Sequence, residues 1–326
     1  MAVDYAKEIS KAALGIGAIT LKPDDPYTWA SGFRMPIYND NRKHLHYPAN
    51  RKMITGAFYD IIIKNNISVD AVSGTSTAGI APAASLAQLL NVPLLIIDNN
   101  TICEYSPEFV RSLTAKIVDK LHDKYYNAIA STCPHAIIPA VFAANDKEVS
   151  FAYAREKPKS HGLQQQIEGI VDESDNILLV DFYKGTSYAD KAKAALEEKK
   201  ALVKDVLSED ISAKLIVPKL DGKTILHIED LVSTGGSCIE EIQTFRAAGA
   251  TVAYCAAIFS YDFPESLKKF SDINCNFRAA LGYEQLLEGA IETGAIKPEQ
   301  HEMLKEWRQA PFEWGAKRGF PKVEKK

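Results

Sequence analysis

Apolar runs that end in small-residue turns, each followed by a helical pattern, recur along the chain. In residues 70–90, DAVSGTSTAGIAPAASLAQLL, a strand through Val72 leads into the loop Gly74–Gly79 and then into a helix. In residues 225–259, the run ILHI, the loop STGGS and a helical stripe repeat this order, and Gly249 ends the helix before another strand. Continuous apolar strands alternating with helices predict an α/β fold, with a mainly parallel central sheet covered by helices on both faces.

The remaining segments are less regular. Residues 98–147 contain the helical pattern FVRSLTAKIVDKLHDKYYNAI, and residues 172–221 contain a strand pattern, NILLVDF, and one long helical pattern, YADKAKAALEEKKALVKDVL. No internal repeat joining these two segments is evident from the sequence. Two short helices, split at Gly294 and Pro298, are expected near the C-terminus, and the charged tail KRGFPKVEKK is expected to be frayed.

Composition narrows the class of protein. The chain has 326 residues and a formal net charge of -4, which argues against a general nucleic-acid binder. Its five cysteines form no C-x-x-C pair, so we expect reduced thiols in a cytoplasmic protein rather than disulfides or a zinc site. The N-terminus lacks a signal-peptide pattern, and no apolar run approaches the ~20 residues that span a bilayer, so we expect no membrane partner.

Two adjacent acids, Glu229 and Asp230, stand between the apolar run ILHI and the loop STGGS. We expect Ser237 and Glu240 to form a capping box at the start of the next helix. A small-residue loop that leads into a helix offers backbone N–H groups and the positive end of the helix dipole to a phosphate. The spacing matches neither a Walker A loop nor a dinucleotide-binding loop.

The acids leave two interpretations open. In one, the loop 233–237 binds the phosphate of a sugar phosphate, and the sugar hydroxyls face Glu229 and Asp230 with Mg²⁺ on their outer side. In the other, the segment is a helix-capping turn with two exposed acids. The loop Gly74–Gly79 is likewise either a ligand-binding loop or an ordinary turn between a strand and a helix.

The segment ILHIEDLVSTGGS, residues 225–237, closely resembles the phosphoribosyl-pyrophosphate (PRPP) motif of type I phosphoribosyltransferases. Four further segments resemble those of orotate phosphoribosyltransferases in the family's order: DPYTWASGFRMPIYNDNR, SGTSTAGIAPAASLA, AYAREKPKSHGLQQQIEG and AAIFSYDFPES. The resemblance covers most of residues 1–97, 148–171 and 222–310. It implies transfer of phosphoribosyl from PRPP to orotate in UMP biosynthesis, giving orotidine 5′-monophosphate and pyrophosphate, with Mg²⁺ as cofactor.

The resemblance also implies a set of site residues. Catalytic roles fall to Lys159, His161, Glu229 and Asp230, and Asp230 is also a possible ligand of Mg²⁺, which is otherwise held through PRPP. PRPP binding falls to Arg155, Lys159, His161, Thr75, Ser76, Thr77, Glu229, Asp230, Leu231, Val232, Ser233, Thr234, Gly235, Gly236 and Ser237. Orotate binding falls to Arg34, Tyr38 and Ser233.

The loop REKPKSHG is, from its residues alone, a solvated surface loop, whereas the resemblance makes it a mobile catalytic loop that closes over the site of the neighbouring subunit. A homodimer is therefore implied. Two positions that are often basic in the family differ here, because the chain has Glu156 and Ala30. Asp40 and Arg42 fit a local salt bridge at least as well as a ligand site.

The length exceeds that of typical family members. We expect one phosphoribosyltransferase domain over 1–326, with an N-terminal hood over 1–50 and two insertions, 98–147 and 172–221, that flank the catalytic loop. We predict that the insertions pack together as an added subdomain. Two other functions stay open: transfer to another base, or a non-catalytic regulator that senses PRPP.

Overall fold

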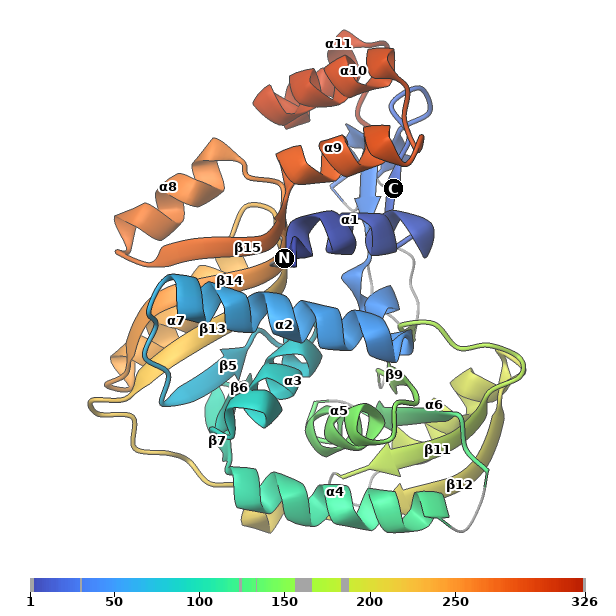
Figure 1. Ribbon diagram of the computed structural model, residues 1–326, viewed down its shortest axis with the longest axis vertical. Coiled ribbons are helices and arrows are strands. Elements are labelled where there is room, and N and C mark those ends of the chain that lie inside the picture. Colours follow the sequence, from blue (N-terminus) through green and yellow to red (C-terminus); the bar gives the residue numbers. More distant parts are fainter. Residues whose placement is uncertain are drawn as a thin grey trace.

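Two separate sheets form the centre of the molecule, seen in a computed structural model that describes residues 3–29, 31–122, 125–132, 134–155, 166–182 and 188–324 (Figure 1). The first sheet has the strand order β15–β14–β13–β5–β6–β7, parallel except for β7. The long β13 lies at its centre, as its apolar run predicts. Its strands are β5 (Ala71–Gly74), β6 (Leu94–Asp98), β7 (Thr101–Tyr105), β13 (Thr224–Val232), β14 (Thr251–Ser260) and β15 (Asn276–Gly282).

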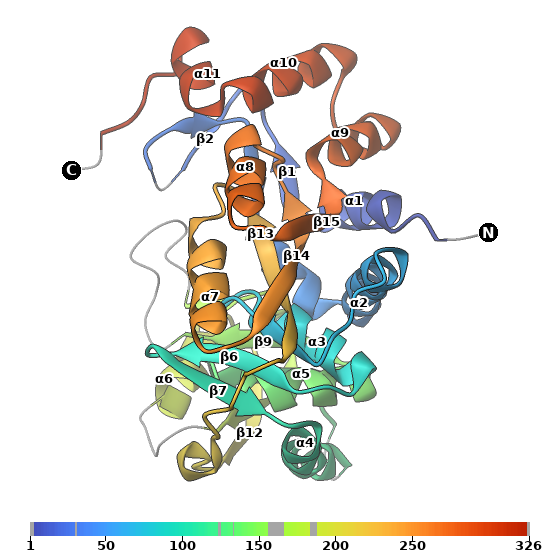
Figure 2. The same cartoon turned by 90° about the vertical axis from the view of Figure 1, so that its left-hand side faces the viewer.

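Helices cover both faces of the first sheet, which confirms the predicted fold class (Figure 2). Helices α1 (Tyr5–Gly15), α2 (Pro48–Lys64) and α3 (Ile80–Leu90) pack on one face. Helices α7 (Gly236–Ala247) and α8 (Pro264–Asp272) pack on the other. No helix within the described residues is long and apolar enough to cross a membrane.

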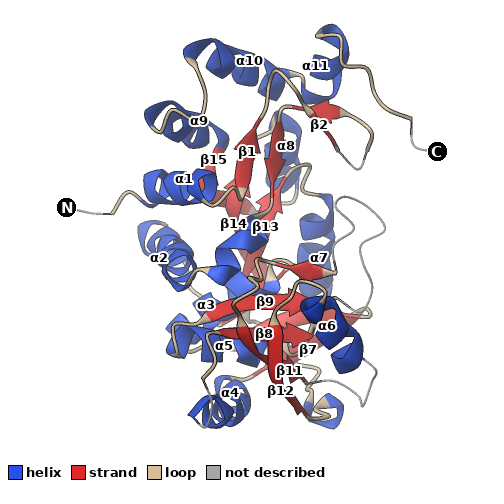
Figure 3. Ribbon diagram, turned by 90° about the vertical axis from the view of Figure 1, so that its right-hand side faces the viewer, coloured by secondary structure: helices blue, strands red, loops and turns tan. Residues whose placement is uncertain are grey.

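The second sheet has the strand order β10–β9–β8–β11–β12 (Figure 3). Successive side chains of a strand point to opposite faces, and here one set packs with α5 (Ile137–Asp146) and the other with α6 (Tyr188–Glu197). Helix α4 (Pro107–His122) packs on α5, and α5 also packs on α3, which joins the two sheets. The strands are β8 (Ala128–Thr132), β9 (Ser150–Ala154), β10 (Ile167–Glu168), β11 (Asn176–Asp181) and β12 (Leu202–Ser208).

Strand β8 from residues 98–147 pairs in parallel with β11 from residues 172–221, so these two segments are in contact. Their division between the sheets does not follow the expected insertion boundaries, because β7 belongs to the first sheet and β9 and β10 belong to the second. The single long helix expected over residues 188–207 is wrong. Helix α6 ends at Glu197, and Lys200 adopts a positive φ of 65°. The chain then forms β12, which is followed by the short helix η2 (Ser212–Lys214).

The N-terminal hood is built from short antiparallel pairs and is covered by the C-terminal helices. Strand β1 (Ile19–Leu21) pairs with β4 (Ile37–Asn39), β2 (Tyr27–Thr28) pairs with β3 (Arg34–Met35), and η1 (Asn41–His46) follows. Helices α9 (Tyr283–Glu292), α10 (Pro298–Gln309) and α11 (Pro311–Lys317) lie at the same end of the molecule (Figure 1). The indole of Trp307 packs edge-on against Trp29 and Tyr261.

The C-terminal tail is bound rather than frayed as far as it is described. The Val323 N–H donates a hydrogen bond of 2.9 Å to the Gly32 carbonyl, and the Phe320 ring stacks on Trp314. Glycine is required at position 32, because its φ is +83° and a Cβ there would lie 2.3 Å from the Val323 carbonyl oxygen. The hood and the tail therefore form one packed unit.

The buried His44 predicts how stability depends on pH. Neither ring nitrogen has a partner among the described residues, and burial lowers the pKa of His44 to about 4 although Asp40 opposes this shift. Below pH 6.5 the unfolded chain binds a proton that the folded protein does not, so acidification favours unfolding.

We therefore expect the free energy of unfolding of the wild type to fall between pH 6.5 and 4 by about 1.4 kcal/mol per unit more than that of His44→Leu. Urea titrations at several pH values measure the difference. Parallel curves for the two proteins would show that His44 is protonated in the folded state.

Candidate functional site

The acid pair lies at the carboxyl end of β13. Glu229 is only 5% exposed and Asp230 is half-buried, which contradicts the interpretation with two exposed acids. The Glu229 Oε1 accepts a hydrogen bond of 2.8 Å from the Asp230 backbone N–H. Burial, and then the negative charge of Asp230, raise the pKa of Glu229 well above its usual value. The two carboxyl groups therefore lie close enough together for the charge of one to oppose ionisation of the other.

The loop after the acid pair leads directly into α7. Gly235 caps this helix in the left-handed conformation, with φ +75°, and α7 begins at Gly236. The expected capping box of Ser237 and Glu240 is wrong, because Ser237 already lies inside the first turn and no side chain caps the helix. The N–H groups of this turn have no partners within the helix and offer a binding site for an anion.

The loop Gly74–Gly79 lies beside the acid pair because β5 and β13 are parallel neighbours. It approaches β13 so closely that a Cβ at Gly79 would lie 2.7 Å from both the Ile228 carbonyl oxygen and the Thr75 nitrogen. The Ser76 hydroxyl donates to the Ile97 carbonyl at 2.7 Å, and the Ser76 N–H donates to Glu241 Oε1 at 3.1 Å. This loop is thus fixed by contacts on both sides.

A buried histidine supports the same loop, and sequence reasoning missed it. The His227 ring lies between the hydroxyls of Ser73 and Thr75, with Nδ1 2.7 Å from Ser73 Oγ and Nε2 2.9 Å from Thr75 Oγ1. The Thr75 hydroxyl is therefore used within the protein. The available signal was a histidine inside the otherwise apolar run ILHI.

A pocket of about 320 Å³ joins these parts into one site. It brings together the loop Gly74–Gly79, the acid pair, the end of the hood and the end of β9. Of the loop 233–237 only Ser237 lines it, whereas residues 233–236 do not. Asn41, in the hood, donates from Nδ2 to the Asp230 carbonyl at 2.6 Å and so holds the hood against β13. The lining residues are Asn39, Asp40, Arg42, Thr75, Ser76, Thr77, Ala78, Arg155, Glu229, Asp230, Leu231 and Ser237.

Two arginines in this pocket share one buried carboxylate. Glu168 is 2% exposed at its side chain, and its Oε1 accepts from Arg155 Nε at 2.6 Å. Its other oxygen pairs with Arg42, whose Nε also donates to Asp40 Oδ1 at 2.5 Å. Although burial opposes the charge, Asp40 and Glu168 raise the pKa of Arg42. Asp40 and Arg42 thus form the expected salt bridge and also line the pocket, whereas Glu168 was not anticipated.

Several expected site residues lie elsewhere. The Arg34 guanidinium donates to the Pro26 carbonyl from Nε and Nη2, at 3.1 and 2.7 Å. Tyr38 is half-buried with its ring centre 5.6 Å from that of Tyr27, and burial raises its pKa. Neither residue lines this pocket, and Val232 is buried in the core. Lys159, His161, Glu156 and Ala30 lie outside the described residues.

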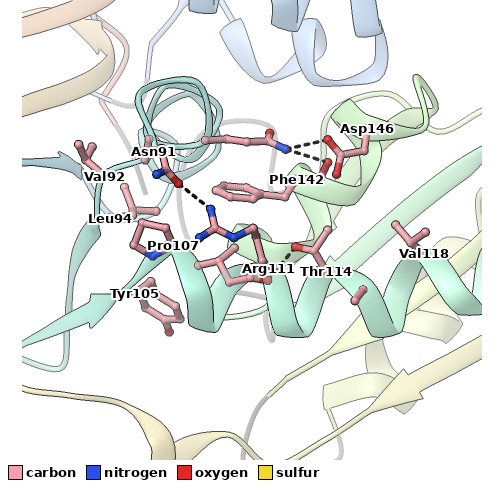
Figure 4. Close-up of a pocket in the computed structure, with 14 residues that line it drawn as sticks. Asn91, Val92, Leu94, Tyr105, Pro107, Arg111, Thr114, Val118, Phe142 and Asp146 are labelled. Atoms are coloured by element: carbon pink, nitrogen blue, oxygen red, sulfur yellow. Dashed lines mark hydrogen bonds between the residues drawn. The ribbon is translucent and has the colours of Figure 1, made fainter.

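A second cavity, of about 470 Å³, lies between α3, α4 and α5 (Figure 4). Arg111 lies at this cavity and donates to Asn91 Oδ1 at 2.6 Å. Asn91 caps the C-terminal end of α3, whereas the loop Gly74–Gly79 precedes its N-terminal end. This cavity is therefore at the opposite end of α3 from the acid pair and is not part of the candidate site.

Known proteins resemble the chain over most of its length. It is 30% identical over 303 residues to the orotate phosphoribosyltransferase of Staphylococcus haemolyticus, covering 93% of this chain and 98% of that protein. It is 28% identical over 312 residues to the orotate phosphoribosyltransferase of Coxiella burnetii, covering 96% and 99%. The UMP synthase structure of Leishmania donovani has a similar fold, with a TM-score of 0.50 and 17% identity. The match covers 93% of this chain and 42% of the Leishmania chain. No protein-family model matches.

The tight approach at Gly79 generates a testable prediction. Gly79→Ala places a methyl group against Ile228 and Thr75, so we expect a loss of about 1–3 kcal/mol in stability and weaker binding of inorganic pyrophosphate. Gly15→Ala is the matched control, because nothing lies within 4 Å of a Cβ there. Calorimetry and thermal unfolding give the two readouts. Equal behaviour of both variants would contradict the geometry assigned to this loop.

Proposed function

Because this chain belongs to the orotate phosphoribosyltransferase family, we propose that it transfers a phosphoribosyl group from PRPP to orotate, giving orotidine 5′-monophosphate and pyrophosphate. The observation that carries the proposal is the pocket in which the acid pair Glu229–Asp230 lies between two loops suited to phosphate. In the cell, this reaction belongs to UMP biosynthesis. We further propose a cytoplasmic protein.

The pocket suggests how PRPP lies. The 5′-phosphate would bind the N–H groups of the loop 233–237, whose side chains include the Ser233, Thr234 and Ser237 hydroxyls. The ribose hydroxyls would donate to Glu229 and Asp230, and the pyrophosphate would lie along Thr75, Ser76 and Thr77. Arg155 would face the pyrophosphate charge.

The reaction breaks the bond between the anomeric carbon and pyrophosphate and forms a bond from that carbon to an orotate nitrogen. Charge builds up on the departing pyrophosphate, so cations and N–H groups held in place beforehand lower the barrier. Carboxylate oxygens are the ligands that Mg²⁺ prefers, and Asp230 at the pocket fits an ion held mainly through PRPP. When bound, Mg²⁺ neutralises part of the pyrophosphate charge.

The roles of the remaining residues rest on the family resemblance. Lys159 and His161 would act on the leaving pyrophosphate, and Arg34, Tyr38 and Ser233 would bind orotate. Arg34 uses only Nε and Nη2 on the Pro26 carbonyl, and its guanidinium has further N–H donors. The resemblance also implies a homodimer that shares its catalytic loop across subunits.

Base specificity is the first prediction from this proposal. With PRPP and Mg²⁺, we expect the protein to consume orotate and to leave hypoxanthine, adenine, xanthine and uracil unchanged, as followed by absorbance. Turnover with a purine only would show that the protein is a phosphoribosyltransferase for another base. PRPP binding without any turnover would indicate a regulator.

Asp230→Asn is the second prediction. Loss of the charge weakens hydrogen bonds from the ribose, so we expect kcat/KM for PRPP to fall about 10- to 100-fold with the fold intact. Asp119→Asn, on the exposed side of α4, is the control and should keep wild-type kinetics. An unchanged kcat/KM for Asp230→Asn would remove this carboxylate from ribose binding.

A further inference from the structure

Equivalent strand pairs occur in both sheets, and their residue numbers differ by a constant amount. The sequence analysis did not detect this relation. Val72 of β5 pairs with Leu94 of β6, and Ile129 of β8 pairs with Phe151 of β9. Each residue of the second pair carries the number of its counterpart plus 57. The same offset relates α3, which starts at Ile80, to α5, which starts at Ile137. It also relates two residues after these helices that both have a positive φ, Asn91 and Glu148.

The other half of each sheet corresponds in the same way. Ile225 pairs with Ala71, and Ile177 pairs with Ala128, so β13 and β11 differ by 48 residues. Both ladders to the next strand shift register just before counterpart residues, between Thr224 and Leu226 in β13 and between Ile177 and Leu178 in β11. A positive φ follows the helix in each half, at Gly249 and at Lys200.

The strand orders therefore match over five strands, β14–β13–β5–β6–β7 and β12–β11–β8–β9–β10, with the last strand antiparallel in both. Ile97 pairs with Ile102 in the first sheet, and Ala154 pairs with Ile167 in the second. The second sheet thus repeats five of the six strands of the first, without a counterpart of β15, and lies between β7 and β13 in the sequence.

The contact between α3 and α5 has the symmetry of a two-fold dimer. Gln88 and Asn145 are counterparts, and they bond to each other at 3.0 Å. Asn145 Nδ2 also donates to Ser85 Oγ at 3.0 Å, and Gln88 Nε2 reaches the carbonyl of Phe142, the counterpart of Ser85, at 3.5 Å. Such reciprocal contacts are the mark of an isologous interface.

The second copy keeps only one acid of the pair and differs from the loop Gly74–Gly79 at key positions. Phe182 stands where the first copy has Asp230, and Asp181, counterpart of Glu229, accepts a hydrogen bond of 2.7 Å from Thr132. Pro134, which has no N–H, replaces Thr77. Ala136 replaces Gly79, where the first copy has no space for a Cβ.

What the second copy keeps is a cation directed at the first copy. Arg155 is the counterpart of Asp98, and it lines the pocket beside Ala78. The reciprocal contact joins Asp98 to His135, the counterpart of Ala78, with 3.0 Å between Asp98 Oδ2 and His135 Nε2. Each copy therefore extends the end of this strand to the loop of the other. Among the residues that the structure describes, only the site of the first copy has two adjacent acids, Glu229 and Asp230.

We propose that residues 125–208 take the place of a partner subunit, so that one chain builds one complete phosphoribosyltransferase site with Arg155 supplied in cis. The proposal rests on the proposed function for its ligand. It departs from the shared homodimer that the family resemblance implies, because both halves of the site belong to the same chain.

Complementation between two impaired variants tests this directly. Chains carrying Arg155→Ala and chains carrying Asp230→Asn are co-expressed with different tags, and orotate turnover is measured on the mixture. We expect no more activity than the two variants give separately. Sharing between subunits would restore about a quarter of the wild-type rate, because half of randomly assembled dimers are mixed and each keeps one intact site.

Two measurements on the wild type keep the test decisive if a variant fails to fold. Turnover per chain should stay constant on dilution through the range in which light scattering shows monomers, and a loss of turnover on dilution would overturn the proposal. Calorimetry with PRPP should give one site per chain, whereas two would overturn it. A wild type that binds one PRPP but does not consume orotate would contradict only the proposed function.

Discussion

The site depends on the contact between the loop Gly74–Gly79 and the Ile228 carbonyl of β13. The Thr75 N–H donates to that carbonyl at 3.0 Å, and the bare Cα of Gly79 leaves it room. Parallel pairing of β5 and β13 places the carboxyl ends of both strands at one edge, where ligands bind in open α/β sheets. The acid pair, the loop and the start of α7 share one pocket because this contact holds.

The charges around the pocket are arranged for binding rather than for stability. Glu168 and Arg42 are both largely removed from water, which costs solvation energy that ion pairing only partly returns. Their value lies in position, since together they hold Arg155 at the edge of the pocket. A hydrophobic replacement of comparable volume could preserve the fold, but it would leave Arg155 without its anchor.

The sequence predicted the parts of the fold that depend on local pattern. The apolar run before Glu229, the helix after Gly79 and the two C-terminal helices all have clear periodicity or punctuation, and the structure has them. The end of α6 at Glu197 was missed, because alanine, lysine and glutamate favour helix on both sides of the turn at Lys200. The adjacent acids and the loop Gly74–Gly79 were recognised from the sequence as candidate site residues, and the structure places them at one pocket.

What could not be predicted depends on register and on contacts distant in sequence. The two copies share identical residues at scattered positions, such as Ile80 and Ile137 or Pro82 and Pro139. The duplication becomes clear only from which strands pair and where the backbone turns to positive φ. Glu168 and His227 likewise gain meaning only from partners brought to them by the fold: Arg155 and Arg42 for the first, Ser73 and Thr75 for the second.

The attachment of the tail to the hood has a practical consequence for handling the protein. The Arg34 guanidinium lies over the Phe320 ring, with Cζ 5.6 Å from the ring centre. The Val323 N–H donates a hydrogen bond to the Gly32 carbonyl. An affinity tag or fusion partner appended at the C-terminus would pull on the segment that holds Arg34. The opposite terminus, where Val3 is exposed, is the safer place for it.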